Sequence, residues 1–291
     1  MSAKVDAAIL RVILIVFSGL IIISLWGFYS SIRPPKIIST LTPRDLKMNY
    51  EDVSFKTADG LTLRGWFIPG ARVTEKTLIL LHGYPADKGN ILPALSFLHE
   101  DFHLLLFDFR YLGKSEGNYS TVGAKEVEDL LAAIQFLKSR GVREVGVWGF
   151  SMGGAVALMA IEKAPEIKAV ISESSYASLA DMTFELLRIP VLNYPIAYLV
   201  GFWAKLFLGI DVKDASPANL IRNTKIPILL IHSSADAVIP FSHARSLQQA
   251  LTQNPNAEFW FHEEYAHGQL ALDYRNRVRD FFHKHLSANV R

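Results

Sequence analysis

Five short apolar runs place the strongest constraint on how this 291-residue chain can fold. Each run is continuous rather than alternating, as is typical of strands that helices cover on both faces. Between the second and third runs, residues 124–139 carry apolar side chains at helical spacing and stop before Gly141. Strands that alternate with helices predict an α/β fold with a mostly parallel, doubly wound sheet. The five runs are Thr77–Leu81, Leu104–Phe107, Val145–Trp148, Ala169–Ile171 and Ile228–Ile231.

Two segments depart from this alternation. Residues 52–57 and 61–67 alternate around Asp59-Gly60, which predicts an antiparallel hairpin at the start of the sheet. Residues 176–226 are too many and too apolar for a simple connection. We interpret them as a helical cap over the strand ends, with extra core packing or a second membrane-contacting surface as the alternatives. The cap residues expected to contact substrate are Leu187, Leu192, Tyr194 and Trp203.

The N-terminal segment is unlike the rest of the chain. Val12–Tyr29 contains no charge and, with the residues before it, is long enough to cross a hydrocarbon core of about 30 Å. We expect a single-pass transmembrane anchor at residues 7–29, then a linker at residues 30–50 and the main domain at residues 51–291. A cleaved signal peptide is the alternative, but the run is long for one and no small-residue cleavage site follows. Basic residues are nearly balanced on the two sides, which leaves the topology open with a slight bias toward a cytoplasmic domain.

Composition argues against several classes of function. The net charge is +2 and the chain has no long basic run, so nucleic-acid binding is not expected. Without cysteine the chain has neither a disulfide framework nor a thiolate nucleophile. It has no phosphate-binding loop or dinucleotide fingerprint, and its histidines lack metal-ligand spacing with carboxylates. We therefore expect no cofactor and no metal, while the oligomeric state stays open.

A serine stands in a sequence frame typical of nucleophiles. Gly149-Phe150-Ser151-Met152-Gly153 follows the third apolar run and precedes a helical pattern, which places the serine on a sharp, exposed turn. A serine hydroxyl needs a histidine base that a carboxylate orients. Asp236 and His267 follow in the order serine, acid, histidine that this scaffold uses. The sequence therefore predicts a catalytic triad of Ser151, Asp236 and His267.

The same chemistry needs two backbone N–H groups to stabilise negative charge on the substrate oxygen. Met152 supplies one at the start of the predicted helix. Tyr84 supplies the other in the turn after the first apolar run, where Pro85 has no N–H. Glu173, at the end of another strand, is the alternative acid. Four further side chains near the strand ends are expected to be structural: His82, His103, Asp108 and Arg110.

These motifs together resemble the α/β-hydrolase superfamily, and most of all its membrane-anchored serine hydrolases related to monoglyceride lipases and esterases. The resemblance covers the chain from about Val53 to the C-terminus. It implies an α/β-hydrolase fold in which Ser151 is the nucleophile, His267 the base and Asp236 its orienting acid. The matching residues are His82–Tyr84, Asp108–Gly117, Gly149–Gly153, Ser216-Pro217, His232–Asp236 with Ile239-Pro240, and His267-Gly268.

The expected function is hydrolysis of a carboxylic ester or thioester through an acyl-enzyme intermediate. The apolar cap and the anchor favour a small-molecule or lipid-like acyl substrate. A serine peptidase or amidase on the same fold is the alternative, because the same triad cleaves amides. A membrane-tethered binding protein without turnover is the alternative of a different class.

Overall fold

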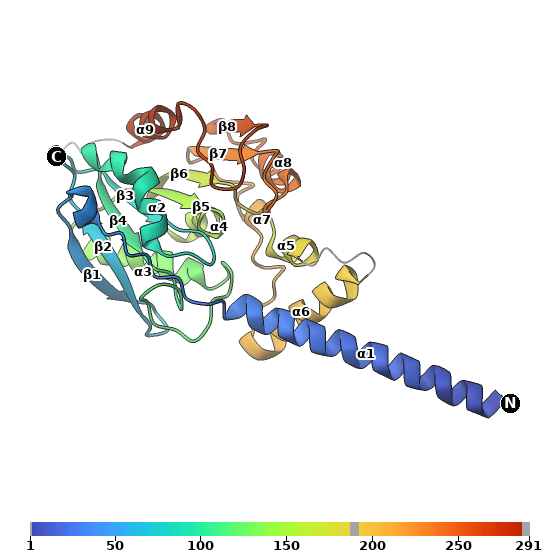
Figure 1. Ribbon diagram of the computed structural model, residues 1–291. Coiled ribbons are helices and arrows are strands. Elements are labelled where there is room, and N and C mark those ends of the chain that lie inside the picture. The colour runs from blue at the N-terminus through green and yellow to red at the C-terminus, as the bar shows by residue number, and fades with distance from the viewer. Residues whose placement is uncertain (1, 187–191, 287–291) are drawn as a thin grey trace.

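The computed structural model describes residues 2–186 and 192–286, which contain an eight-stranded sheet with helices on both faces (Figure 1). The strands are β1 (Glu51–Lys56), β2 (Thr62–Ile68), β3 (Thr77–Leu81), β4 (His103–Phe107), β5 (Val145–Phe150), β6 (Ile167–Glu173), β7 (Ile228–Ser233) and β8 (Ala257–His262). The α-helices are α1 (Ser2–Ile32), α2 (Lys88–Leu95), α3 (Glu126–Ser139), α4 (Met152–Ala160), α5 (Leu179–Leu186), α6 (Asn193–Leu208), α7 (Pro217–Leu220), α8 (Phe241–Ala250) and α9 (Tyr274–His285).

The sheet confirms the predicted topology. Its strand order is β1-β2-β4-β3-β5-β6-β7-β8, and the pairs from β4 through β8 are parallel. The first two strands form the expected antiparallel hairpin, and β2 also pairs antiparallel with β4. Because the parallel strands share one direction, their carboxyl ends meet at one edge of the sheet. The segments that carry Tyr84, Ser151, Asp236 and His267 all begin at that edge.

Two apolar layers on either side of the sheet explain why the strand sequences are continuously apolar. In β3, Leu78 and Leu80 belong to the layer that includes residues of α2 and α9, whereas Ile79 and Leu81 belong to the layer that includes residues of α3, α4 and α8. All four side chains are fully buried. Successive side chains of a strand point to opposite faces, so a strand covered on both sides buries apolar side chains on each of them.

The predicted cap is helical. Between β6 and β7 the chain forms α5, α6 and α7. Gly209 caps the C-terminus of α6, and its φ of 67° is in the left-handed region typical of helix C-termini. Figure 1 shows α5 and α6 on the side of the domain that α1 reaches, with α6 beside the C-terminal half of α1. Leu187, one of the predicted substrate contacts, lies outside the described residues.

The N-terminal helix is joined to the domain. Ala7–Ile32 is long and apolar enough to cross a membrane, and its N-terminal part extends away from the domain (Figure 1). Its last turns are different, because Ser24 and Phe28 are buried. The ring of Phe28 stacks on that of Phe207 in α6, with 6.0 Å between their centroids. Cap and N-terminal helix therefore form one packed unit.

The segment between α1 and the sheet lies along the domain surface. The hydroxyl of Tyr111 donates to the Pro34 carbonyl oxygen at 2.8 Å. The Ser39 hydroxyl donates to the carboxylate of Asp87 at 2.5 Å, and Met48 is buried with the core residues around α2. The expected linker is thus held against the domain along much of its length, and it does not act as a free spacer.

Candidate active site

Ser151 stands at a strained turn between β5 and α4. Its φ of 54° and ψ of −117° are sparsely populated for a residue with a side chain, and such strain typically costs on the order of 1–3 kcal/mol. The turn needs close backbone approach on both sides of the serine. A Cβ at Gly149 would lie 2.3 Å from the Gly153 carbonyl oxygen, and one at Gly153 would lie 2.6 Å from that of Leu81. The two glycines are thus required by packing around Ser151.

Asp236 and His267 contact each other directly. The His267 Nδ1–H donates to Asp236 Oδ2 at 2.7 Å, and the Asp236 side chain is fully buried. The other carboxylate oxygen accepts the backbone N–H groups of Val238 and Ile239, each at 2.9 Å. Burial alone would raise the pKa of Asp236, but the hydrogen bonds from His267 and the backbone outweigh it and lower the pKa. The carboxylate is therefore ionised at neutral pH and holds the imidazole with Nε2 available as a base.

The ring of Phe150, the residue before Ser151, lies beside the ring of His267. Its centroid is 4.7 Å from that of His267. A Cβ added to Gly268 would lie 3.2 Å from Phe150 Cζ, and one added to Gly83 would lie 3.0 Å from Phe150 Cδ1 and 3.2 Å from Ser151 Cβ. The turns after β3, β5 and β8 therefore meet around Phe150 and Ser151. Sequence reasoning gave Phe150 no role, although it stands at the variable position of the G-x-S-x-G frame.

The turn after β3 is fixed by His82. The Phe109 N–H donates to His82 Nε2 at 3.1 Å, so the proton is on Nδ1, which donates to the Gly83 carbonyl oxygen at 2.7 Å. Burial lowers the pKa of His82 and keeps it neutral. Within the described residues, the N–H groups of Tyr84 and Met152 have no hydrogen-bond acceptor. His82 thus orders the turn after β3, and the N–H groups of Tyr84 and Met152 can donate to a substrate oxygen.

Glu173 does not contact His267 in the described part of the chain. Its carboxylate accepts the Tyr274 hydroxyl at 2.5 Å inside the domain, and burial raises the pKa of Glu173 to about 7. Its backbone carbonyl accepts the Ser151 N–H at 2.8 Å. The structure thus joins His267 to Asp236, and Glu173 supports the serine turn through its main chain.

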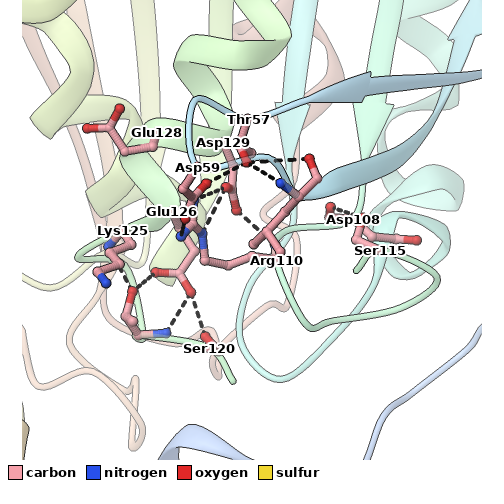
Figure 2. Close-up of polar contacts among 12 residues, drawn as sticks. Thr57, Asp59, Asp108, Arg110, Ser115, Ser120, Lys125, Glu126, Glu128 and Asp129 are labelled. Carbon is pink, nitrogen blue, oxygen red and sulfur yellow. Dashed lines mark hydrogen bonds and ion pairs between the residues drawn. The ribbon is translucent and has the colours of Figure 1, made fainter. Parts of the chain in front are cut away.

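Asp108 and Arg110 lie in separate ion pairs on the loop after β4. Asp108 accepts from Lys88 Nζ at 2.6 Å. Figure 2 shows Arg110 between Asp129 of α3 and Asp59 of the β1–β2 turn; it bonds the first at 2.7 and 2.9 Å and the second at 2.9 and 3.3 Å. These ion pairs of Arg110 hold the loop after β4 in place. The same loop contains Phe109, whose N–H donates to His82, so the ion pairs indirectly stabilise the turn after β3.

The three described cap residues lie away from these groups. Tyr194 is exposed and its ring is 5.6 Å from that of Phe184, and Leu192 is also exposed. Trp203 donates its indole N–H to Ser24 Oγ of α1 at 3.0 Å. No hydrogen bond or ring contact among the described residues joins them to the serine, aspartate or histidine. Within the same residues, no three histidine or carboxylate side chains are grouped as metal ligands.

Two contacts between α1 and the domain were not foreseen. The hydroxyl of Tyr84 donates to the Ser31 carbonyl oxygen at 2.6 Å, and the Ser120 N–H donates to that of Ile32 at 2.9 Å. The last four carbonyls of a helix have no partner within the helix, so such donors complete its C-terminus. Tyr84 therefore contacts the end of α1 through its hydroxyl, while the backbone N–H of the same residue lies in the turn after β3. Neither contact had a signal in the sequence, because both use backbone carbonyl oxygens of α1.

Comparison with known proteins agrees with this fold. A family described as alpha/beta hydrolase fold matches residues 76–197. The protein YfhR of Escherichia coli is 33% identical over 207 residues, covering 68% of this chain and 66% of YfhR, just under two thirds of its length. The alpha/beta hydrolase domain-containing protein WAV2 of Arabidopsis thaliana is 28% identical over 232 residues, covering 75% of this chain and 72% of WAV2.

A solved structure is similar over most of the chain. An esterase from Pyrococcus furiosus matches with a TM-score of 0.73 and 28% identity, covering 88% of this chain and 99% of the esterase. The similarity therefore includes the sheet and the strand ends that carry the site. Fold and neighbour together support hydrolase activity.

Proposed function

The chain belongs to the α/β-hydrolase superfamily, and we propose that it is a serine hydrolase that cleaves carboxylic esters or thioesters. The observation that carries this proposal is the 2.7 Å hydrogen bond between His267 and Asp236, at the same sheet edge as the strained Ser151. A carboxylate that accepts from Nδ1 fixes the tautomer in which Nε2 can take a proton. The similarity to an esterase supports the same reaction class.

The reaction proceeds in two steps through Ser151. Its Oγ bonds to the acyl carbon while His267 Nε2 takes the hydroxyl proton, and the imidazolium then protonates the departing alcohol or thiol. Water next attacks the acyl-serine ester, with His267 taking the proton of water and returning it to Ser151 Oγ. The acid leaves and the serine is regenerated. Asp236 stays ionised throughout and stabilises the imidazolium.

Two N–H groups stabilise the oxyanion in both steps. The amides of Tyr84 and Met152 have no acceptor among the described residues, which suits donors that meet one only when substrate binds. Each such donor contributes about 3 kcal/mol in comparable enzymes. The Met152 amide also stands at the N-terminus of α4, where the helix dipole favours negative charge.

The substrate class follows from the surroundings of the site. An acyl or lipid-like substrate fits an enzyme whose cap and N-terminal helix are strongly apolar. We also propose that α1 is retained as a membrane anchor, because Ser24 and Phe28 pack against the cap and the Ser31 carbonyl is bonded to Tyr84. A signal peptide is removed after translocation and would not form part of the folded domain.

The test replaces the nucleophile in the full-length protein. Ser151→Ala should abolish labelling by a fluorophosphonate probe and lower hydrolysis of p-nitrophenyl butyrate by more than about a thousandfold. Ser246→Ala, an exposed serine in α8, is the matched control and should keep both. Persistent labelling of the Ser151→Ala protein would show that another residue is the nucleophile. Comparing the butyrate ester with the corresponding anilide separates an esterase from an amidase.

A further inference from the structure

We propose that α6 of the cap is itself immersed in the membrane, packed on α1 in the leaflet next to the domain, with its exposed aromatic stripe facing lipid. The proposal rests on the proposed role of α1 as a membrane anchor and does not depend on the hydrolase activity. In this proposal lipid covers the apolar face of the cap. Water, a second copy of the chain and a soluble partner are the alternatives that the experiment distinguishes from lipid.

The stripe is continuous along one side of α6. Tyr194, Tyr198, Phe202 and Leu206 recur every four residues and are each more than half exposed. Side chains four apart lie on one face of a helix. The only charged residue of α6 is Lys205, near its C-terminal end. Monomeric soluble proteins rarely expose so many large apolar side chains together.

Hydrogen bonds and ring contacts fix the position of α6 along α1. The indole N–H of Trp203 donates to Ser24 Oγ at 3.0 Å, and one turn further on Phe207 stacks on Phe28. From N- to C-terminus the two helices therefore follow the same sense along this contact, and Figure 1 shows α6 crossing the C-terminal half of α1. Phe202, next to Trp203, lies at the depth of Ser24. A small polar residue that bonds across a helix pair is typical of helices packed within a membrane.

The length of α1 then requires that Ser24 lies in the membrane. The apolar span starts at Ala7, and the 17 residues up to Ile23 cover about 26 Å at about 1.5 Å per residue. A hydrocarbon core of about 30 Å needs at least three more residues, and any tilt needs further ones. Ser24 is therefore inside the hydrocarbon region whenever α1 crosses it, and Trp203 and Phe202 share its depth.

The side chains beyond Ser24 suit the membrane surface. Trp26 and Tyr29 are exposed on α1, at the level where amphipathic rings favour the interface. The guanidinium of Arg33 lies over the Tyr29 ring at 5.5 Å, and Lys205 is exposed on the domain side of Trp203. Long basic side chains at this level reach the lipid headgroups. Because the linker is held against the domain, nothing separates the domain from this surface.

The experiment uses single cysteines, since the chain has none of its own. Full-length Phe202→Cys is labelled with an environment-sensitive fluorophore and reconstituted into phosphatidylcholine nanodiscs. Ile15→Cys, exposed on α1, is the lipid-facing control, and Val73→Cys, exposed on a loop before β3, is the water-facing control. Quenching is measured with spin-labelled acyl chains in the bilayer and with iodide in the water.

We expect the label at Phe202 to be blue-shifted and quenched by the spin-labelled lipid as strongly as the label at Ile15. Iodide should quench only the label at Val73. Quenching of the Phe202 label by iodide, or shielding from both quenchers by a protein contact, overturns the proposal. If the Phe202 variant does not fold, a label at Leu206→Cys reports on the same face of α6. None of these measurements requires enzymatic activity.

Discussion

Replacing Asp236 with asparagine tests the role of the carboxylate with little change of shape. One carboxylate oxygen accepts the N–H groups of Val238 and Ile239, and the other accepts His267 Nδ1–H. An asparagine has a single acceptor oxygen, which the two backbone donors will hold. Its NH₂ group then faces Nδ1, and two donors cannot point at each other. The imidazole must move its proton to Nε2, where it can no longer accept the proton of Ser151.

The expected loss is large because the variant removes the reactive tautomer. The equivalent change in a serine protease of another fold lowers kcat about 10⁴-fold, which corresponds to about 5 kcal/mol of transition-state stabilisation. We expect a loss of that order in kcat for p-nitrophenyl butyrate. The KM should change little, because Asp236 is fully buried and does not contact substrate. Near-ultraviolet circular dichroism and thermal unfolding verify that the variant is folded.

Glu173→Gln is the matched control. The glutamine can still accept the Tyr274 hydroxyl, and the side chain makes no contact with His267 among the described residues. We expect its kcat to stay within a few-fold of wild type. The reasoning is refuted if folded Asp236→Asn loses less than about tenfold, or if Glu173→Gln loses as much as Asp236→Asn. The second result would make Glu173 the acid.

Two further predictions concern stability. Burial raises the pKa of Glu173 to about 7 from an ordinary 4.5, so the stabilisation from its protonated form is complete below pH 4.5 and lost as pH rises through 7. Compared with Glu173→Gln, the wild type should lose up to about 3 kcal/mol of unfolding free energy as the pH rises from 4.5 to above 7. The Tm of the wild type minus that of the variant should therefore fall over this range, and a difference that stays constant contradicts the prediction. Gly149→Ala should cost about 3 kcal/mol or more, because its Cβ would meet the Gly153 carbonyl at 2.3 Å. Gly201→Ala in α6, with no atom closer than 3.4 Å, should leave Tm unchanged or higher, and equal effects of the two changes would contradict the packing argument.

Local sequence patterns predicted most of the fold because they reflect burial directly. In β3, Leu78–Leu81 are all apolar because the sheet has an apolar layer on each face, one with residues of α2 and α9 and the other with residues of α3, α4 and α8. The hairpin could be recognised from Asp59-Gly60 because the turn needs a residue with positive φ, and Gly60 has a φ of 89°. Element bounds were less accurate, since β6 extends two residues beyond each end of the predicted run.

Long-range contacts could not be read in the same way. The order of Ser151, Asp236 and His267 indicates which carboxylate should face the histidine. Only the tertiary structure, however, shows that His267 bonds to Asp236 and not to the alternative, Glu173. Ser24 and Trp203 are 179 positions apart, and each alone has an ordinary interpretation. Their hydrogen bond depends on how the cap lies on the domain, which neither periodicity nor composition records.

The contacts of α1 fix the orientation of the site relative to the axis of this helix. Trp203 bonds to Ser24 from the cap, and Tyr84 bonds to the Ser31 carbonyl from the turn beside Ser151. Two attachments more than a turn apart on one helix prevent the domain from rotating about it. If α1 crosses a bilayer, the edge of the sheet that carries the site then keeps one position relative to the lipid surface. A hydrolase held in this way would take its acyl substrate at a constant depth, which connects the packing of the N-terminal helix with the chemistry proposed for Ser151.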